Sequence, residues 1–196
     1  MCIRDSPSFF PRTDFAWMSP ECTWHSRARG AKKASNPGQD TLWGESLPNE
    51  AAQRSRATMW DVVRFSEHHD YEAVIVENVV EIADWPPYRS WLQAMDSLGY
   101  RAQVLSLNSM HAQAYGMPAP QSRDRVYVVF TKKGNRRPDF DRMQRPKAYC
   151  ATCDEVVDAM QAWKKPDRDP MRPGRYRSQY VYRCPNVRCR NQVVEP

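Results

Sequence analysis

The sequence lacks any uninterrupted apolar run of about 18 residues, the length that a membrane-spanning helix needs, so no such helix is expected. Its beginning also lacks the apolar stretch of a secretory signal, which favours a cytoplasmic protein. Glycine is scarce, with 7 glycines against 16 prolines, so many connections are expected to be extended. The apolar content is nevertheless 41% of 196 residues, which is enough to bury a core and excludes a disordered chain.

Excess positive charge is missing from most of the chain and gathers near its end. Residues 1–131 carry 13 Lys and Arg against 15 Asp and Glu, whereas residues 132–196 carry 16 against 8. A near-neutral body with a basic region suits a polyanionic partner such as DNA. The alternative is a solvated basic surface that only keeps the protein soluble.

Both ends of the chain look cut. The first six residues, Met-Cys-Ile-Arg-Asp-Ser, resemble a translated sequencing-library adapter, so residues 1–6 are left out of the fold prediction and Cys2 is given no function. A genuine N-terminus is the alternative. The chain stops just after a cysteine pair, with no terminating helix or strand, which is compatible with a second truncation. We therefore expect a fragment.

Six segments have the pattern of regular secondary structure. A continuous β-branched run at residues 71–76 predicts a central parallel strand covered on both faces. Residues 14–19 predict a buried strand, Thr58 is the expected N-cap of a helix, and Gly99 is expected to end another. The other predictions are a long mobile loop at 27–57, helices at 58–69 and 87–98, and strands at 100–107 and 125–131.

This order of elements indicates an α/β protein with a doubly wound sheet. Ligands of such folds sit at the carboxyl ends of the strands. Three polar motifs lie beside predicted strands; two follow a strand directly and the third precedes one.

The first motif is Ser-Pro-Glu-Cys-Thr-Trp-His-Ser at residues 19–26. A lone cysteine is usually a small buried hydrophobe. In a polar loop, however, a thiol is exposed and can ionise, which is where nucleophilic cysteines occur. Cys22 is therefore a candidate nucleophile.

The second motif, Glu77-Asn78-Val79, directly follows the predicted strand 71–76. A carboxylate at that position is costly unless it is used or paired. The alternatives are a helix N-cap role for Asn78 and a surface position for Glu77.

The third motif is Gln-Ser-Arg-Asp-Arg at residues 121–125. Arg123 and Arg125 alternate, so they lie on the same side of an extended segment. Two arginines placed in this way can clamp a phosphate or a base carbonyl. The alternative is an ordinary salt bridge with Asp124 or Glu77.

Taken together, the three motifs resemble the signature of the DNA cytosine-5 methyltransferase family: a Pro-Cys loop, then Glu-Asn-Val, then Gln-x-Arg-x-Arg, in this order. Residues 115–118, Tyr-Gly-Met-Pro, resemble the family's Tyr-Gly-x-Pro lead-in, and Ser26 stands four residues after Cys22 as in the family loop. Each motif is weak alone, but the ordered set is specific. The resemblance covers about residues 13–131 and implies a Rossmann-like methyltransferase sheet that is present in part.

The resemblance also implies a reaction, the transfer of a methyl group from S-adenosylmethionine to C5 of cytosine in double-stranded DNA. Cys22 would attack C6 and make C5 reactive. Glu77 would contact N3 and the exocyclic amine and supply a proton or hydrogen bond, and Asn78 would order the loop. Arg125 would hold the cytosine O2, and Arg123 would support the loop or a phosphate. The base would have to leave the duplex, at a cost of about a few kcal/mol.

Three positions depart from the family pattern. Glu21 replaces the proline before the nucleophile, Thr23 replaces a glutamine, and residues 119–120 lengthen the segment before Gln121. Such variants resemble those of bacteriophage enzymes. A carboxylate beside a thiol disfavours the thiolate, so we expect Glu21 to point away or to meet a cation.

Most of the family's methyl-donor site has no counterpart in the sequence. The Gly-rich first loop and the acid that holds the ribose have no match, and the family's later motifs are absent after residue 131. We predict that this polypeptide alone binds the donor poorly and methylates nothing. We also expect a monomer in a bacterial or phage-infected cell, with restriction-modification or phage self-protection as alternative roles.

Two cysteine pairs lie in the basic region 132–196, which would follow an adapter-derived segment 1–6 and a partial catalytic domain 7–131. The pairs Cys150-x2-Cys153 and Cys184-x4-Cys189 predict a structural zinc (Zn²⁺) site of ribbon type with four thiolate ligands. Disulfides are the alternative. The residues expected to form the small core of this region are Tyr149, Tyr180 and Tyr182.

The four-cysteine region falls where the family carries its target-recognition region. We predict that it helps to hold the duplex, mainly through phosphates. The side chains expected to do so are Lys164, Lys165, Arg168, Arg172, Arg175 and Arg177.

Two other functions compete with the enzyme. One is a non-catalytic zinc-ribbon DNA-binding protein on a degenerate methyltransferase body. The other, a zinc-dependent nuclease, would need a His/Asp/Asn cluster, and the pair His68-His69 has no partner carboxylate at ligand spacing. His25 and His111 are predicted to be polar loop residues.

Overall fold

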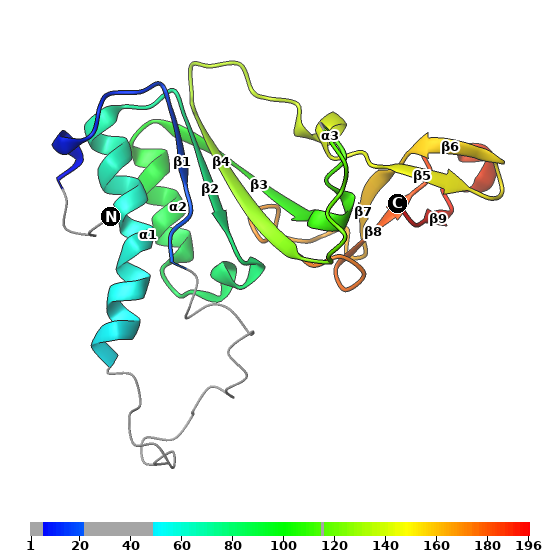
Figure 1. The fold of residues 1–196 in the computed structure, drawn as a ribbon, viewed down its shortest axis with the longest axis horizontal. Coiled ribbons are helices and arrows are strands. Elements are labelled where there is room, and N and C mark those ends of the chain that lie inside the picture. Colours follow the sequence, from blue (N-terminus) through cyan, green and yellow to red (C-terminus); the bar gives the residue numbers. More distant parts are fainter. Residues whose placement is uncertain (1–5, 22–48, 115) are drawn as a thin grey trace, which may run out of the picture. The chain divides into compact units, whose positions relative to one another are not determined.

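The fold was analysed in a computed structural model that describes residues 6–21, 49–114 and 116–196, with the backbone alone at 49–56 (Figure 1). The chain divides into two compact units. The first unit is Met1–Ala102 with Phe130–Lys133, and the second unit is Gln103–Val129 with Gly134–Pro196. The second unit thus holds residues 121–125 together with both cysteine pairs, while the functional boundary at residues 131 and 132 stays a prediction.

Four strands form a sheet in the order β1-β2-β4-β3. Strands β1 and β2 are parallel, with Phe15 opposite Ala73 and Met18 opposite Val76. The predicted α/β class is therefore confirmed, and so are the four predicted strands and the central position of the second. The strands are β1 (Phe15–Met18), β2 (Ala73–Asn78), β3 (Tyr100–Asn108) and β4 (Asp124–Lys132).

The core of the first unit is built around Trp91, on the inner face of α2. Its indole Nε1 donates a hydrogen bond of 2.8 Å to the carbonyl of Met59 in α1, and its ring meets Phe130 edge to face at 5.2 Å. These contacts join the two helices to each other and to the end of β4. The helices are α1 (Asn49–His69) and α2 (Tyr88–Ser97), drawn in cyan and green in Figure 1.

Gly99 follows α2 with a φ of +87°, a conformation that suits glycine, so the predicted helix end is confirmed. The described helices include none that is long and apolar enough to cross a bilayer.

The predicted start of the first helix was wrong. Helix α1 begins at Asn49, nine residues before the predicted start, and Thr58 lies inside it instead of capping it. The added residues include alanine, glutamine and arginine, which favour helices strongly enough to extend this one. The rest of the predicted loop lies outside the described residues.

Strand β1 is not buried as predicted. It is the terminal strand in the sheet order, and the side chains of Phe15 and Trp17 are 73% and 62% exposed. An apolar run alone does not distinguish a central strand from an edge strand, because both positions accept the same side chains.

The second unit ends in a cysteine module, residues 147–194, made of two small antiparallel sheets, β5-β6 and β7-β8-β9. Tyr180 and Tyr182 are fully buried beside Cys150 and Cys184, so the prediction that they form its core is confirmed. Tyr149 is 56% exposed and was wrongly placed in that core, because the pairing of β5 turns its side chain to the opposite face. The strands are β5 (Lys147–Cys150), β6 (Glu155–Asp158), β7 (Met160–Trp163), β8 (Tyr180–Arg183) and β9 (Val193–Val194).

Short helical turns complete the two units. Four of them are short 3-10 helices. They are η1 (Pro7–Phe9), η3 (Val80–Asp84), η4 (Ser109–His111) and η5 (Val187–Cys189), with a short α-helix, α3 (Phe140–Met143).

Candidate functional site

The carboxyl ends of β1 and β2 lie next to each other in the first unit. Because the two strands are parallel and Met18 faces Val76, the chain leaves both at the same edge of the sheet. The segment after β1 runs through Pro20 and Glu21, and Glu77 and Asn78 end β2. The described part of the first motif, residues 19–21, and the second motif therefore lie at one edge of the sheet.

Asn78 links these two strand ends. Its side chain is only 3% exposed, and its amide Nδ2 donates a hydrogen bond of 3.2 Å to the carbonyl of Pro20, two residues before Cys22. Its Oδ1 accepts from the backbone N–H of Val79 at 2.8 Å. The helix that follows has Val79 as its N-cap residue and no side-chain capping bond, so the alternative N-cap role of Asn78 is not found.

A second contact holds the same loop. The hydroxyl of Thr58 in α1 accepts a hydrogen bond of 3.1 Å from the backbone N–H of Glu21. Two main-chain groups that precede Cys22 are thus fixed, one by a strand and one by a helix. Cys22, Thr23, His25 and Ser26 lie outside the described residues.

Residues 121–125 lie in the second unit. The backbone N–H of Arg123 donates to the buried Oδ1 of Asn108 at 3.4 Å, and its carbonyl accepts from the N–H of Ser109 at 3.1 Å. Ser109 also donates from its hydroxyl to the carbonyl of Gln121. Both the N–H and the carbonyl group of Arg123 are therefore hydrogen-bonded to residues at the end of β3.

The arginines of this segment differ in exposure. Arg123 is exposed, whereas Arg125 is half-buried and donates from Nη1 to the carbonyl of Asp124 at 2.9 Å. The carboxylate of Asp124 accepts from Asn108 and from the backbone of Tyr176. Glu77 and Arg125 belong to different units and Cys22 is outside the described residues, so the convergence of these three residues stays a prediction.

The four cysteines of the cysteine module come together. The sulfur atoms of Cys150, Cys153, Cys184 and Cys189 all lie within 4.8 Å of one another, and all four thiols are free. Tetrahedral thiolates at the usual zinc–sulfur length are about 3.8 Å apart, so the cluster fits a metal ion of that type after a small contraction.

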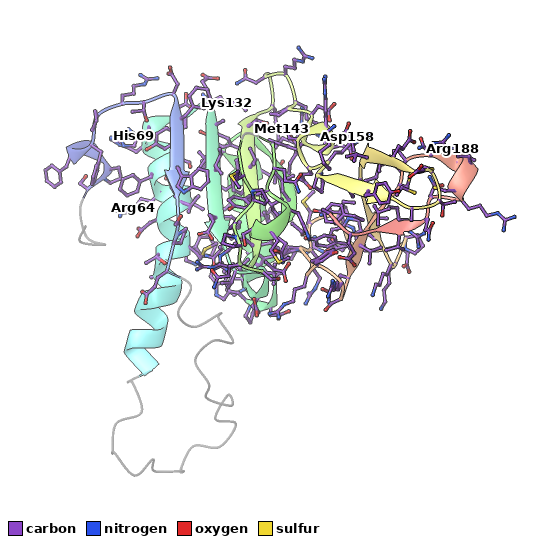
Figure 2. The ribbon with its side chains drawn as sticks, turned by 45° about the vertical axis from the view of Figure 1, so that its right-hand side comes forward. Arg64, His69, Lys132, Met143, Asp158 and Arg188 are labelled. Carbon is purple, nitrogen blue, oxygen red and sulfur yellow. The ribbon has the colours of Figure 1, made fainter. Side chains whose placement is uncertain are left out.

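Two thiols of the cluster have opposite environments. Arg188, labelled in Figure 2, donates from Nε to the sulfur of Cys153 at 3.3 Å, and this lowers the pKa of that thiol to about 7. Burial raises the pKa of the Cys184 thiol to about 12. A bound cation would favour the thiolate at both positions.

Asn108 is a structural residue of the site that sequence analysis missed. It is the last residue of β3 and is buried, just as Asn78, which was predicted to order the loop, is the buried last residue of β2. A polar amide at the end of an apolar strand was the available signal. His111, predicted to be a polar loop residue, is instead 3% exposed, with its ring against Tyr176 at 4.3 Å, and burial lowers its pKa.

The histidine pair on α1 has a structural role. His69, labelled in Figure 2, is buried, and its Nε2 lies 3.0 Å from the carbonyl of Pro7. This contact attaches the N-terminal segment to the helix. The ring also stacks on Tyr71 at 5.1 Å, which is a packing arrangement and not a metal site.

The predicted basic side chains lie in and around the connection between β7 and β8. Arg168 places its guanidinium 3.5 Å from the centre of the Trp163 ring, and burial lowers its pKa. Arg177 pairs with Glu195 at 3.2 Å. The exposed members of the set are Lys164, Lys165, Arg172 and Arg177.

A hollow of about 540 Å³ lies beside β1 and α1 in the first unit. Its charged lining residues are Glu21, Asp61 and Arg64, of which Asp61 and Arg64 pair with each other at 2.9 Å. Most of the remaining lining is apolar. Its aromatic lining residues are Phe10, Phe15, Trp17, Phe65 and Tyr71.

Residues 44–172 match the model of a family described as C-5 cytosine-specific DNA methylase. A search of curated proteins found no match. Among solved structures, the chain is similar to the S. pombe Dnmt2 methyltransferase, with 16% identity and a TM-score of 0.42 over 67% of this chain and 33% of that one. It is also similar to a Spodoptera frugiperda DNMT2 mutant, with 14% identity and a TM-score of 0.39 over 64% and 32%. The chain spans about a third of the length of these structures.

Proposed function

Because this chain belongs to the C-5 cytosine-specific DNA methylase family, we propose that it is part of an enzyme that transfers a methyl group to C5 of cytosine in double-stranded DNA. The observation that carries the proposal is the hydrogen bond from Asn78 to the carbonyl of Pro20. It fixes the loop that leads to Cys22 against the end of β2, which carries Glu77. A nucleophile and an acid would then act on the same base.

Cys22 would act as the nucleophile. Its thiolate would form a bond to C6 of the cytosine, and the electron pair of the C5–C6 double bond would move so that C5 becomes nucleophilic. After methylation, loss of the C5 proton would return the electron pair, break the sulfur–C6 bond and release the thiolate. The hydrogen bonds of Asn78 and Thr58 support this role because they hold the backbone just before the thiol.

Glu77, Arg125 and Arg123 would act on the base and its surroundings. Glu77 would contact N3 and the exocyclic amine and supply a proton or hydrogen bond as charge develops on the ring. Arg125 would hold the cytosine O2, and its half-buried position suits a contact in a closed site. Arg123 is exposed, which suits contact with a phosphate or with the loop of Cys22.

S-adenosylmethionine would supply the methyl group as an electrophile. The four glycines that the structure describes lie apart from one another in the sequence, at positions 99, 116, 134 and 174, and form no glycine-rich loop. The described residues thus do not fit a donor site, and no step of donor binding is assigned to them. We propose that this polypeptide needs a donor-binding partner segment to turn over.

The cysteine module would hold a structural zinc ion through Cys150, Cys153, Cys184 and Cys189. The fit of four free sulfur atoms within 4.8 Å of one another supports this assignment. Arg188 would offset part of the negative charge of four thiolates, since it already donates to Cys153. The exposed lysines and arginines nearby would contact the phosphates of the duplex, with the protein acting as a monomer in the cytoplasm.

A trapping experiment tests the proposal. A duplex with 5-fluorocytosine cannot lose its C5 substituent as a proton, so the covalent complex with the enzyme should persist. The chain should be joined to the donor-binding segment of a family member and incubated with this duplex and S-adenosylmethionine. We expect a covalent adduct at Cys22, located by peptide mass spectrometry. The polypeptide alone should transfer no tritium from labelled donor to DNA.

Matched cysteine variants make the trapping decisive. Cys22→Ser should abolish the adduct, whereas Cys2→Ser should leave it unchanged. DNA binding without any adduct would overturn the proposal and favour the alternative, a zinc-ribbon DNA-binding protein on a degenerate methyltransferase body. Salt dependence of binding, measured with Lys165→Ala, would then report the phosphate contacts separately.

A further inference from the structure

One carboxylate links residues 121–125 to the cysteine module inside the second unit. Asp124 stands between the two arginines that we assign to the base and the phosphate. Its Oδ1 accepts a hydrogen bond of 3.0 Å from Asn108 Nδ2 and another of 3.1 Å from the backbone N–H of Tyr176. The first donor belongs to the end of β3 and the second to the cysteine module.

On one side of this link, Asn108 organises residues 121–125. It is fully buried, and its Nδ2 also donates to the hydroxyl of Ser122 at 3.0 Å. Its Oδ1 accepts from the N–H groups of Met110 and Arg123. One amide therefore contacts three consecutive residues of the motif, including one of its arginines.

On the other side, Tyr176 belongs to the packed aromatic group of the cysteine module. Its ring lies 5.8 Å from Tyr180 and 5.7 Å from Tyr182, and these two buried rings share a core with Cys150 and Cys184. His111, from the turn after β3, packs against Tyr176 and Tyr182 at 4.3 and 4.9 Å. A continuous path of buried and half-buried contacts thus runs from the sulfur cluster to Asp124.

Two further hydrogen bonds join the cysteine module to β3. The hydroxyl of Ser106 in β3 accepts from the N–H of Gly174 at 2.9 Å, and the carbonyl of Ser106 accepts from Gln161 Nε2 at 2.9 Å. Two residues that precede Tyr176, Gln161 and Gly174, are therefore both attached to Ser106 of β3. This attachment gives the module a fixed place against the strand that carries Asn108.

We propose that Asp124 is a positioning residue that couples the metal-loaded cysteine module to Arg123 and Arg125. The inference rests on the proposed function, because it assigns the arginines to the substrate and the cysteines to a metal. Without the metal, the aromatic core that packs against Tyr176 loosens. The carboxylate of Asp124 then loses the hydrogen bond from the N–H of Tyr176, and residues 121–125 become locally mobile. Asp124 itself contacts neither metal nor substrate.

Amide hydrogen exchange on the whole zinc-loaded chain tests this coupling without donor or DNA. Asp124→Ala should raise exchange of residues 119–125 by about tenfold, the effect of losing one buried hydrogen-bond acceptor. Asp124→Asn keeps an acceptor oxygen and should restore slow exchange. Chelation of zinc should raise the same exchange in the wild-type chain but add little in Asp124→Ala, because the link is already broken.

The controls separate positioning from folding. Peptides of β2 in the first unit should exchange equally in all three chains, and zinc content should not change in Asp124→Ala. Equal exchange in Asp124→Asn and Asp124→Ala, or exchange of residues 119–125 that ignores chelation, would overturn the coupling. Because this readout needs no catalysis, a positive result alongside failed trapping would count against the proposed function alone.

Discussion

The interiors of the two units are stabilised by different interactions. The first unit buries large apolar side chains, with Trp91 and Tyr100 at its centre, and ties them with single hydrogen bonds such as that from Trp91 to Met59. The second unit has short strands, and its core is a cluster of tyrosines around four free thiols. From this difference we predict that burial alone can fold the first unit, whereas the cysteine module of the second needs a metal ion bound by its four thiols.

Removal of the proposed zinc ion is expected to have the largest effect, because it should act on the cysteine module alone. Binding energies of structural zinc are about 10 kcal/mol or more, so chelation, or Cys150→Ser, should unfold the cysteine module while the first unit keeps its slow amide exchange. Zinc content and exchange of β5–β9 against β2 measure this. A zinc-free preparation whose cysteine module stays protected in Cys150→Ser would rule out the metal site.

The reverse experiment targets the first unit. Trp91 is fully buried and meets Phe130 edge to face, so Trp91→Ala should destabilise that unit by about 3–5 kcal/mol. Urea unfolding gives the free energy. Trp17→Ala is the control, because a side chain that is mostly exposed should change stability by no more than about 0.5 kcal/mol. Equal effects of the two variants would contradict the assigned core.

A substitution at Gly174 tests the packing of the second unit, with a smaller expected effect. A Cβ atom on Gly174 would lie 2.6 Å from Cζ3 of Trp163 and 2.8 Å from the Cβ of Gln179. Gly174→Ala should therefore cost about 1–3 kcal/mol through overpacking. Gly134→Ala meets no atom within 4 Å and should be close to neutral. Thermal unfolding of the two variants compares them directly.

The pH dependence of the second unit should differ from that of the first. Burial lowers the pKa of His111 in the folded protein, against the opposing effect of Glu195 and Asp124. The unfolded chain therefore binds a proton more readily, and the contribution of the neutral ring is present above about pH 6.5 and is lost as the pH falls below it. His111→Phe should lose less stability than the wild type between pH 7.5 and 5.5. A parallel decline in both chains would exclude this role.

The weakest expected effect lies on the surface of the first unit. Lys133 and Asp96 form an ion pair of 2.8 Å in which both side chains are about half exposed. Such pairs contribute about 0–1 kcal/mol and less at high salt. A double-mutant cycle with Lys133→Ala and Asp96→Ala measures the coupling. A value well above this range would mean that polar surface contacts, and not only burial, hold the first unit.

The sequence was informative where a local pattern determines the structure. Periodicity located the strands and helices, and cysteine spacing located a cluster that the fold does assemble. Sequence analysis failed where residues far apart in the sequence determine the burial or the bonding of a side chain. Phe15 and Trp17 in β1 look like core residues but lie on an edge strand. Asn108 bonds to residues 14 and 16 positions away, and Asp124 accepts from a residue 52 positions away, so no local pattern reports these links.

The contact between Thr58 and Glu21 has a consequence for position 21, which precedes the proposed nucleophile Cys22. Thr58 accepts its hydrogen bond from the backbone N–H of position 21, and a proline there would have no hydrogen to donate. Positions 21 and 58 should therefore vary together, because a proline at position 21 would remove this hydrogen bond to the hydroxyl of Thr58. A variant that places proline before Cys22 should therefore also carry a substitution at position 58.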